Sequence, residues 1–401
     1  MQISSLIKRL PASPIRKLSP LADLAIRNGI DVIHLNIGQP DIETPGIFHD
    51  AMRQALNRTP IVGYMESAGY RPLREAMAAY FISLGFPFSS DDILVTYGGS
   101  EALQIALLTC LDPGSEILVP EPLYPNYLTF AMPYGLSIIP IPTSREQDFA
   151  LPPYEQLESL VTEKTGAILL SNPGNPTGAV LSEDELDRLT RLAKAHDLFI
   201  IADELYRELT YDGRRPTSFA ARSDIADRLI FIDSISKRYS ACGVRIGCLA
   251  TKNEDIMAGA LKYCQGRLAA SSLEMIAATS LYRLGSDYFD TIRQTYQARR
   301  DMLVARLNTI PGVSCFLPGG AFYTICKLPV DSSETFAAWL LEHFSQNGRT
   351  LMVAPASSFY ITPGLGDQEV RIAYVRDIPD LRDACDILQA ALLQYSEKAQ
   401  G

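Results

Sequence analysis

The sequence predicts an α/β fold. A mostly parallel, seven-stranded sheet with helices on both faces forms a large domain, and a smaller α+β domain is built from both termini. Three observations support this: short, apolar runs alternate with helical stretches, polar clusters directly follow several of these runs, and the pattern changes after Pro311-Gly312. Strands that are apolar throughout are typical of a parallel sheet covered on both faces.

The strands predicted for the large sheet are short runs rich in Ile, Leu and Val, at residues 93–97, 116–120, 136–141, 167–171, 198–202, 229–233 and 246–250. Helical periodicity occupies intervals such as 48–56, 73–84 and 102–111. A helical run with few breaks, from 257 to 307, has the length of an element that bridges two domains. We expect the large domain to span residues 45–290.

The smaller domain is expected to combine the two ends of the chain, residues 1–44 and 291–401. Its predicted elements are strands at 32–36, 313–316, 321–325, 351–355 and 370–374, and helices at 334–344 and 378–395. Strands and helices that do not alternate regularly are typical of an α+β unit.

The composition is that of an ordinary globular protein of 401 residues with a formal net charge of -10. The charges are spread along the chain, which predicts neither a nucleic-acid nor a membrane partner. No run approaches the roughly eighteen apolar residues of a membrane span, and no apolar stretch follows Lys8 and Arg9 as in a secretory signal. The four histidines show no metal-ligand spacing, so no metal is expected.

Cysteine usage favours a reducing, cytoplasmic location. The seven cysteines are Cys110, Cys242, Cys248, Cys264, Cys315, Cys326 and Cys385. Their number is odd, they include no Cys-x-x-Cys, and most lie in apolar runs. We therefore expect buried, reduced thiols.

Lys237 is the first candidate for chemistry, because it closely follows the predicted strand at 229–233. Ligands bind at the carboxyl ends of strands in open α/β sheets. Its amine could form a Schiff base, and Ser234, Ser236 and Arg245 could hold a phosphate. The alternative interpretation is a solvated loop lysine.

Three further turns carry candidate groups. Gly98-Gly99-Ser100-Glu101, between a strand and a helix, would present backbone N–H groups to an anion, although paired glycines in such a turn also serve steric needs alone. Asp203, after an apolar strand, would pair with a buried cation such as a protonated ring nitrogen, or cap the next helix. The proline-stiffened turn from Asn172 to Gly178 holds a second asparagine, Asn175, or is simply a rigid loop.

Together these motifs resemble one family, the pyridoxal-phosphate-dependent aminotransferases of fold type I, class I/II, in the aspartate aminotransferase superfamily. The resemblance rests on Ser-x-Ser-Lys followed by Gly-x-Arg-x-Gly, on Asn-Pro-x-Asn-Pro-Thr-Gly, and on Asp-Glu-x-Tyr. It extends from Gly38 to Arg371 with the motifs in the family's order. It implies pyridoxal 5'-phosphate as cofactor and a homodimer with shared active sites.

The resemblance also implies the roles of individual residues. Lys237 would form the Schiff base and move the proton between the substrate Cα and the cofactor. Asp203 would keep the pyridinium nitrogen protonated. Tyr206 and Asn175 would hydrogen-bond the phenolic oxygen of the cofactor, and Tyr124 would stack on its ring.

Phosphate and substrate sites are implied in the same way. The phosphate would be held by Gly99, Ser100, Glu101, Ser234, Ser236 and Arg245. Tyr64 looks like the family's tyrosine that reaches the phosphate of the neighbouring subunit. Arg371 would grip the α-carboxylate of the substrate, assisted by Asn175 and the Gly38 backbone.

The expected reaction is transfer of an amino group from an L-amino acid to a 2-oxo acid by a ping-pong mechanism. Ser100 stands where some aspartate aminotransferases carry a lysine for an acidic side chain, whereas Tyr124, Tyr127, Tyr70 and Phe359 favour an apolar or aromatic one. The sequence leaves open a broad preference for the side chain of the amino donor, one that includes aspartate. The alternatives are a β-lyase, decarboxylase or cyclopropane-forming synthase on the same scaffold, and a non-enzymatic DNA-binding regulator.

Overall fold

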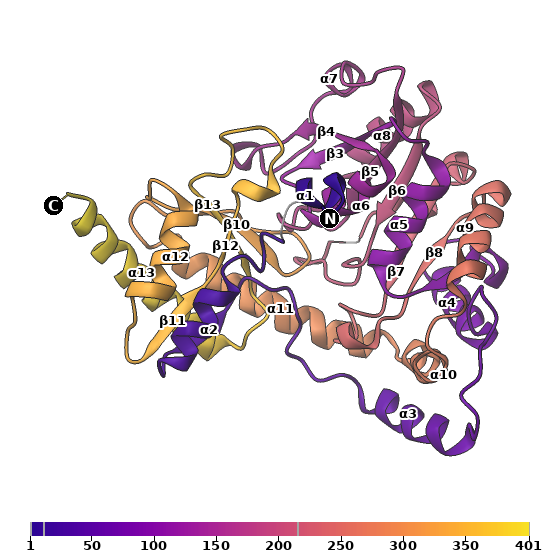
Figure 1. Ribbon diagram of the computed structural model, residues 1–401, viewed down its shortest axis with the longest axis horizontal. Coiled ribbons are helices and arrows are strands. Elements are labelled where there is room, and N and C mark those ends of the chain that lie inside the picture. The colour runs from indigo at the N-terminus through magenta and orange to yellow at the C-terminus, as the bar shows by residue number, and fades with distance from the viewer. Residues whose placement is uncertain (1, 11–12, 215, 401) are drawn as a thin grey trace.

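The computed structural model describes residues 2–10, 13–214 and 216–400 and consists of a large sheet covered by helices beside a smaller group of sheets and helices (Figure 1). The strands are β1 (Asp31–His34), β2 (Ile93–Thr96), β3 (Glu116–Glu121), β4 (Ser137–Pro142), β5 (Thr165–Ser171), β6 (Phe199–Asp203), β7 (Leu229–Ser234), β8 (Gly247–Ala250), β9 (Ser314–Cys315), β10 (Tyr323–Lys327), β11 (Arg349–Met352), β12 (Ala354–Pro355) and β13 (Glu369–Ala373). The α-helices are α1 (Ser5–Arg9), α2 (Ser19–Arg27), α3 (Gly46–Arg58), α4 (Arg71–Ser83), α5 (Gly99–Cys110), α6 (Asn126–Ala131), α7 (Tyr154–Glu158), α8 (Glu183–Ala195), α9 (Glu254–Arg267), α10 (Ser272–Ala278), α11 (Ser286–Leu307), α12 (Ser333–His343) and α13 (Ile378–Gln400).

The large sheet has seven strands, as the sequence predicts, and their order is β2-β8-β7-β6-β5-β3-β4. Every neighbouring pair from β7 to β4 is parallel, and β8 is antiparallel to both β2 and β7. Successive residues of one strand enter different cores. Ile168 and Leu170 of β5 face the cluster that includes α4, α8 and α10, while Leu169 faces the cluster that includes α5, α6 and α9. Burial on both faces explains why these strands are apolar throughout.

Side-chain caps mark the start of two of the helices that cover this sheet, α8 and α9. The α8 helix begins at a capping box, in which the Ser182 side chain accepts from the Glu185 backbone and the Glu185 side chain accepts from the Ser182 backbone. Asn253 caps α9 through the backbone N–H of Ile256. Polar residues at these positions therefore mark where each helix starts.

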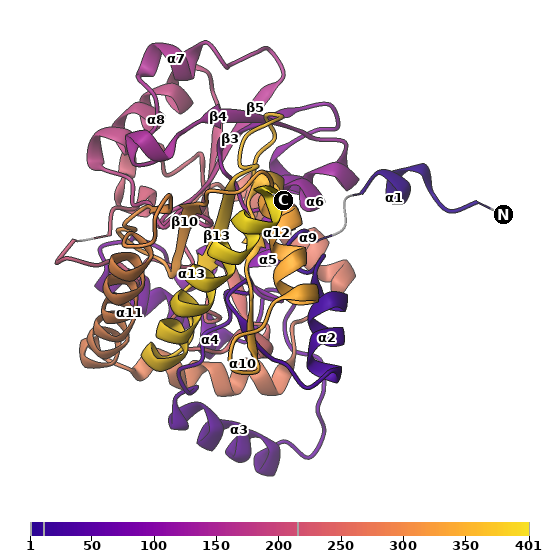
Figure 2. The same ribbon diagram turned by 90° about the vertical axis from the view of Figure 1, so that its left-hand side faces the viewer.

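The smaller part contains segments from both ends of the chain. Its sheet has the order β12-β13-β10-β9, and β1 pairs in parallel with β11. The helices α2, α11, α12 and α13 surround these strands (Figure 2). This confirms the prediction of a smaller α+β unit built from both termini.

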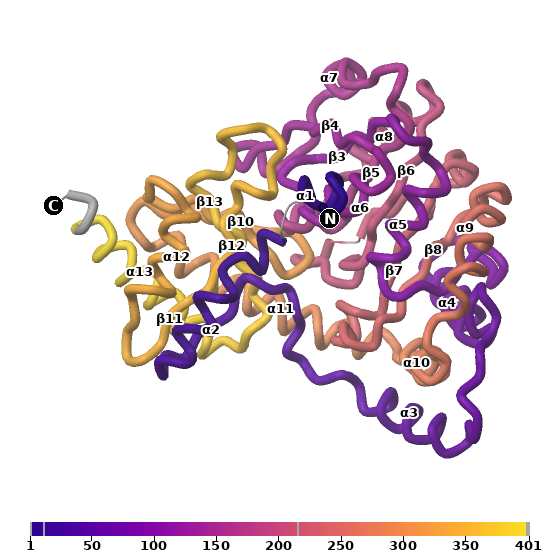
Figure 3. The backbone as a smooth tube through the Cα atoms, viewed as in Figure 1, coloured from indigo at the N-terminus to yellow at the C-terminus, as the bar shows by residue number. Residues whose placement is uncertain are grey.

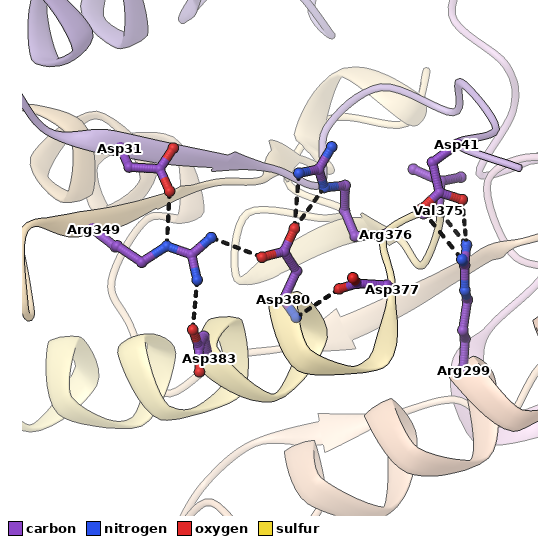
Figure 4. A network of polar contacts seen from close by, with 9 residues as sticks. All are labelled: Asp31, Asp41, Arg299, Arg349, Val375, Arg376, Asp377, Asp380 and Asp383. Carbon is purple, nitrogen blue, oxygen red and sulfur yellow. Dashed lines mark hydrogen bonds and ion pairs between the residues drawn. The ribbon is translucent and has the colours of Figure 1, made fainter.

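Ion pairs hold the segment that follows β1. Arg349 on β11 contacts carboxylates on β1 and α13, namely Asp31, Asp380 and Asp383 (Figure 4). Further along, Arg299 of α11 donates to both carboxylate oxygens of Asp41, at 2.6 and 3.2 Å. The chain then continues to α3 at the lower edge of the molecule (Figure 3). Residues 31–41, which include Gly38, are thus anchored at both ends.

The expected helical run from 257 to 307 has short breaks that divide it into α9, α10 and α11: Leu268 adopts a left-handed backbone with φ of 70°, and Gly285 precedes α11. One expectation from the sequence is wrong. Cys315 and Cys326 form a disulfide, so not all seven cysteines are reduced thiols. Antiparallel pairing of β9 with β10 places these two residues opposite each other, which local sequence does not reveal.

Among the described residues, no helix is long and apolar enough to cross a membrane. The same part of the chain contains no group of three or more His, Cys, Asp or Glu side chains arranged to hold a metal ion.

Candidate active site

Lys237 lies in the turn after β7, in contact with the segment that follows β1. Its side-chain nitrogen donates to the carbonyl oxygen of Gly38 at 2.9 Å and lies 3.8 Å from the sulfur of Cys242. The side chain of Cys242 in turn donates to the carbonyl of Ser236. The structure therefore brings together Lys237 and Gly38, which are 199 residues apart in the chain.

A turn suited to an anion lies beside this lysine, at the start of α5. Gly98 precedes the helix with φ of 74°, and a Cβ atom there would lie 2.6 Å from Nη2 of Arg245. Arg245 donates to the carbonyl oxygens of Tyr97 at 3.1 Å and Cys242 at 2.9 Å. Glycine thus lets the guanidinium approach the helix N-terminus, where backbone N–H groups favour negative charge.

The hydroxyls of Ser234 and Ser236 complete this part of the site, with their oxygens 2.8 Å apart. The backbone N–H of Ser236 also donates to the Ser234 hydroxyl. Glu101 acts differently from its neighbours, because its carboxylate accepts from the Tyr97 backbone and pairs with Arg267 at 3.2 Å. Only backbone groups of Glu101 are therefore available to an anion.

Asp203, the last residue of β6, is a buried carboxylate with incomplete hydrogen bonding. Its Oδ2 atom accepts from the hydroxyl of Tyr127 at 2.9 Å, while Oδ1 is buried with no partner among the described residues. Burial raises the pKa of Asp203 to about 6, and the hydrogen bond from Tyr127 acts in the opposite direction. A cation placed at Oδ1 would compensate for the lost hydration.

Three tyrosines, Tyr206, Tyr323 and Tyr124, lie close to Asp203 and to one another. The hydroxyls of Tyr206 and Tyr323 are 2.9 Å apart, and burial raises the pKa of Tyr206 well above its ordinary value. Any side chain on Gly38 would overlap Tyr323, since a Cβ atom would lie 1.7 Å from its hydroxyl oxygen. Tyr124 accepts from Asn126 at 2.7 Å. Burial favours the neutral form of the Tyr206 and Tyr124 phenols, because it raises the pKa of each.

Arg371 of β13 is a buried cation, only 1% exposed. It donates to Oδ1 of Asn175 at 3.0 Å and to the carbonyl oxygen of Asn36. Its guanidinium lies 4.5 Å from the ring centre of Tyr323 and 5.0 Å from that of Phe359. No carboxylate among the described residues pairs with it, and its Nε has no partner there. A buried arginine in this state is suited to bind a carboxylate in two-point fashion.

The predicted residues therefore converge, with two exceptions. The side chain of Tyr64 is 85% exposed. Tyr70 packs at the start of α4 against the core of the large sheet and contacts Met275 of α10. The sequence indicated no site role for Tyr323 or Asn36 and no contact between Tyr127 and Asp203. Tyr323 and Asn36 lie inside predicted strands, so nothing local distinguished them from core residues.

This set of groups defines a pyridoxal-phosphate enzyme. An amine, a helix N-terminus with an arginine, and a buried carboxylate with a free oxygen match the aldehyde, phosphate and ring nitrogen of the cofactor. The residues that would hold it are Gly99, Ser100, Asp203, Ser234, Ser236, Lys237 and Arg245. The buried guanidinium of Arg371 would be available to the carboxylate of a substrate.

Comparison with known proteins identifies the family. The model of the family "Aminotransferase class I and II" matches residues 30–388. The putative aminotransferase YugH of Bacillus subtilis is 33% identical over 388 residues, which cover 95% of this chain and 96% of that protein. The aspartate aminotransferase of Thermotoga maritima is 31% identical over 394 residues, which cover 96% of this chain and 98% of that protein.

Solved structures agree with this. A crystal structure of aspartate aminotransferase from Thermotoga maritima superposes with a TM-score of 0.89 at 30% identity, covering 97% of this chain and all of that one. The structure of alanine aminotransferase from Pyrococcus furiosus superposes with a TM-score of 0.89 at 28% identity, covering 98% of this chain and all of that one. The chain belongs to the class I and II aminotransferase family, and the predicted fold, the pyridoxal phosphate cofactor and the transaminase activity are confirmed.

Proposed function

We propose that this aminotransferase prefers L-amino acids with an aromatic or apolar side chain as donors. The observation that carries this is the aromatic surround of Arg371: the rings of Tyr323 and Phe359 pack on its guanidinium, and Tyr124 lies nearby. A substrate held by its carboxylate on Arg371 would place its side chain among these rings. One relative, from Thermococcus litoralis, is named aromatic-amino-acid aminotransferase 2 and is 30% identical.

A second candidate donor carries an acidic side chain, and Arg16 favours it. Burial raises the pKa of Tyr124 to about 12, and the positive charges of Arg371 and Arg16 act in the opposite direction, so Arg16 lies within electrostatic range of the site. The segment is held in place because Asn36 donates to the carbonyl oxygen of Ile15 at 2.9 Å. Relatives named aspartate aminotransferase share about the same identity.

A panel of amino donors, each with 2-oxoglutarate, pyruvate or oxaloacetate, decides between these candidates. We expect the highest kcat/KM for phenylalanine, tyrosine or leucine, and little change when Arg16 is replaced by methionine. A preference for aspartate that is lost in Arg16→Met would support the second candidate and contradict the first.

The chain's own groups have distinct proposed tasks. Arg371 and Asn175 orient the substrate carboxylate, and the Gly38 carbonyl positions the amine of Lys237. Lys237 moves the proton between the substrate Cα and the cofactor. Asp203 holds positive charge on the ring nitrogen, and Tyr206 hydrogen-bonds the phenolic oxygen together with Asn175. When bound, pyridoxal phosphate supplies the electron sink for the bond that breaks at Cα.

The remaining contacts to the cofactor are proposed from the same cluster. Tyr124 stacks on the ring, and the phosphate is held by Gly99, Ser100, Glu101, Ser234, Ser236, Arg245 and Tyr64 of a second subunit. Replacement of Lys237 by alanine tests this arrangement as a whole. We expect loss of transamination and of the visible absorbance of the bound cofactor. Full activity in Lys237→Ala would contradict it.

The proposed assembly is a homodimer of a cytoplasmic enzyme, with a large domain at 45–290 and a small domain at 1–44 and 291–401. Exposed apolar residues near Tyr64 support the dimer, since Ile61 is 82% and Val62 60% exposed. Tyr64 itself is 85% exposed, so its hydroxyl is accessible to a second subunit. Five of the seven cysteines are free thiols, which is common in a reducing compartment, whereas the Cys315–Cys326 disulfide is rare there.

A further inference from the structure

Four buried ionic residues lie next to predicted cofactor residues along the chain, and we call them the charge cluster: Glu204, Arg207, Asp233 and Arg238. Each is at most 2% exposed. Glu204 follows Asp203, Arg207 follows Tyr206, Asp233 precedes Ser234, and Arg238 follows Lys237. None of the four is among the residues proposed to bind the cofactor or the substrate. Burying four ionic side chains costs free energy unless they are well paired, so we ask what their pairing does for the neighbouring site residues.

The shortest contact in the charge cluster closes the turn that carries Lys237. Nη1 of Arg238 donates to both carboxylate oxygens of Asp233, at 2.6 and 2.8 Å. The four residues between the two partners include both phosphate-site serines and the lysine itself. An ion pair across the ends of so short a segment restricts the directions in which its side chains can point.

Aromatic rings hold the guanidinium of Arg238 in place. It lies 4.8 Å from the ring centre of Tyr80, 5.1 Å from that of Tyr239 and 5.7 Å from that of Tyr282. Its Nη2 also donates to the Tyr282 hydroxyl at 3.3 Å, and its own carbonyl accepts from Tyr288 at 3.1 Å. Such a cage stabilises a cation and leaves it little freedom. Arg238 can therefore act as a fixed point for the turn.

Arg207 connects this turn to the end of the neighbouring strand, β6. Its guanidinium lies 4.0 Å from Asp233 and 3.7 Å from Glu204, and it donates to the Tyr80 hydroxyl at 3.1 Å. Glu204 is fixed in turn by the Ser218 hydroxyl at 2.8 Å. Two strand ends that carry predicted site residues are thus joined through one set of charges.

We propose that the Asp233–Arg238 ion pair is a positioning device for Lys237, and that Arg207 extends it to the loop that carries Asp203 and Tyr206. The pair touches neither substrate nor cofactor. It keeps the turn closed, so that the lysine amine and the serine hydroxyls stay in register with the Asp203 carboxylate. The inference rests on the proposed role of Lys237 as the residue that binds the cofactor.

The test compares Arg238→Met with Arg238→Lys and with a matched control, Arg300→Met. Arg300 is also a buried arginine, 2% exposed, paired with both oxygens of Asp212 at 2.7 Å, but it contacts no residue assigned to the site. Two quantities are measured: the Kd of pyridoxal phosphate for the apoenzyme, and the pH midpoint at which the visible absorbance of the holoenzyme changes.

We expect Arg238→Met to raise the Kd about tenfold or more and to move the pH midpoint by about one unit, since groups that act as a unit couple on this scale. Arg238→Lys should recover part of both changes, and Arg300→Met should lower the Tm only. Unchanged Kd and midpoint in folded Arg238→Met would overturn the proposal, as would equal changes in Arg300→Met.

Asp233→Asn gives a milder version of the same test if Arg238→Met does not fold, because it keeps the shape of the side chain. It should move both quantities in the same direction, and no change in either would overturn the proposal. Failure of the underlying role of Lys237 is recognised separately. In that case Lys237→Ala would keep the visible absorbance of the bound cofactor, whatever the charge-cluster variants show.

Discussion

At the scale of single residues, the site depends on two buried groups that lack a complementary charge. Arg371 is a cation without a carboxylate partner among the described residues, and Asp203 is an acid with one oxygen unpaired. Burying an unpaired charge of this kind costs free energy in the ligand-free protein, and a bound ligand of opposite charge offsets that cost. The substrate carboxylate and the cofactor ring nitrogen are those ligands in the proposed function.

Replacement of Asp203 by asparagine should stabilise the apoenzyme at neutral pH. The pKa of Asp203 is raised from 3.8 to about 6 in the folded protein. A raised carboxyl pKa means that the folded state binds the proton more tightly than the unfolded chain. The contribution to stability is therefore present below about pH 4 and is lost as the pH rises through about 6.

Asparagine stays neutral, so Asp203→Asn should exceed the wild-type apoenzyme in free energy of unfolding by about 3 kcal/mol at pH 8 and by roughly half of that at pH 5. Urea unfolding at the two pH values measures this. An exposed carboxylate, Asp197, serves as control, and Asp197→Asn should have no such effect. A variant less stable than wild type at pH 8 would show that burial of Asp203 is not the controlling factor.

At the scale of elements, the carboxyl ends of β3, β5, β6 and β7 and the turn before α5 supply the large-domain groups. The strands were predictable because each is a continuous apolar run, and the motifs that follow them were predictable because polar residues interrupt those runs. The contacts between elements were not. The stacking of Tyr323 beneath Arg371, the Tyr127–Asp203 hydrogen bond and the Cys315–Cys326 pair all depend on register and packing between distant segments.

Glu121, the last residue of β3, links the large sheet to the loop that carries Phe359. Its carboxylate is 1% exposed and accepts from the backbones of Ile361 at 2.9 Å and Thr362 at 3.1 Å, and from the Thr362 hydroxyl at 2.6 Å. Because Phe359 packs on Arg371, this link also affects the substrate site.

Glu121→Gln should lower the free energy of unfolding by about 1–3 kcal/mol, because an amide cannot accept all three hydrogen bonds. It should also raise the KM for the amino donor. Urea unfolding and steady-state kinetics measure the two effects, with the exposed Glu146→Gln as control. Wild-type stability together with wild-type KM would contradict the proposed link.

At the scale of the whole molecule, the smaller part meets the large sheet at the candidate site. Gly38 and Arg371 come from the smaller part, whereas Lys237 and Asn175 come from the large sheet. A change in the angle between the two parts would therefore separate the substrate carboxylate from the lysine amine. In the proposed dimer, Tyr64 adds a third contribution from the second subunit.

Mixed dimers test that contribution. Tyr64→Ala and Lys237→Ala subunits should each have low activity alone. If Tyr64 serves the site of its partner, a hybrid of the two contains one site with both defects and one intact site. Unfolding and refolding the two variants together should then restore a substantial fraction of the wild-type activity. No recovery in hybrids shown by mass to have formed would contradict a shared site.

The most direct test of the central claim, that Lys237 and its surroundings carry out transamination, is a half-reaction. Holoenzyme is mixed with excess L-amino acid and no 2-oxo acid, and the released products are counted per subunit. If Lys237 carries out transamination, each subunit releases one equivalent of 2-oxo acid and no free ammonia, with no further product until a 2-oxo acid is added. Continued turnover with release of ammonia, for example from cysteine or cystathionine, would contradict it and identify a lyase.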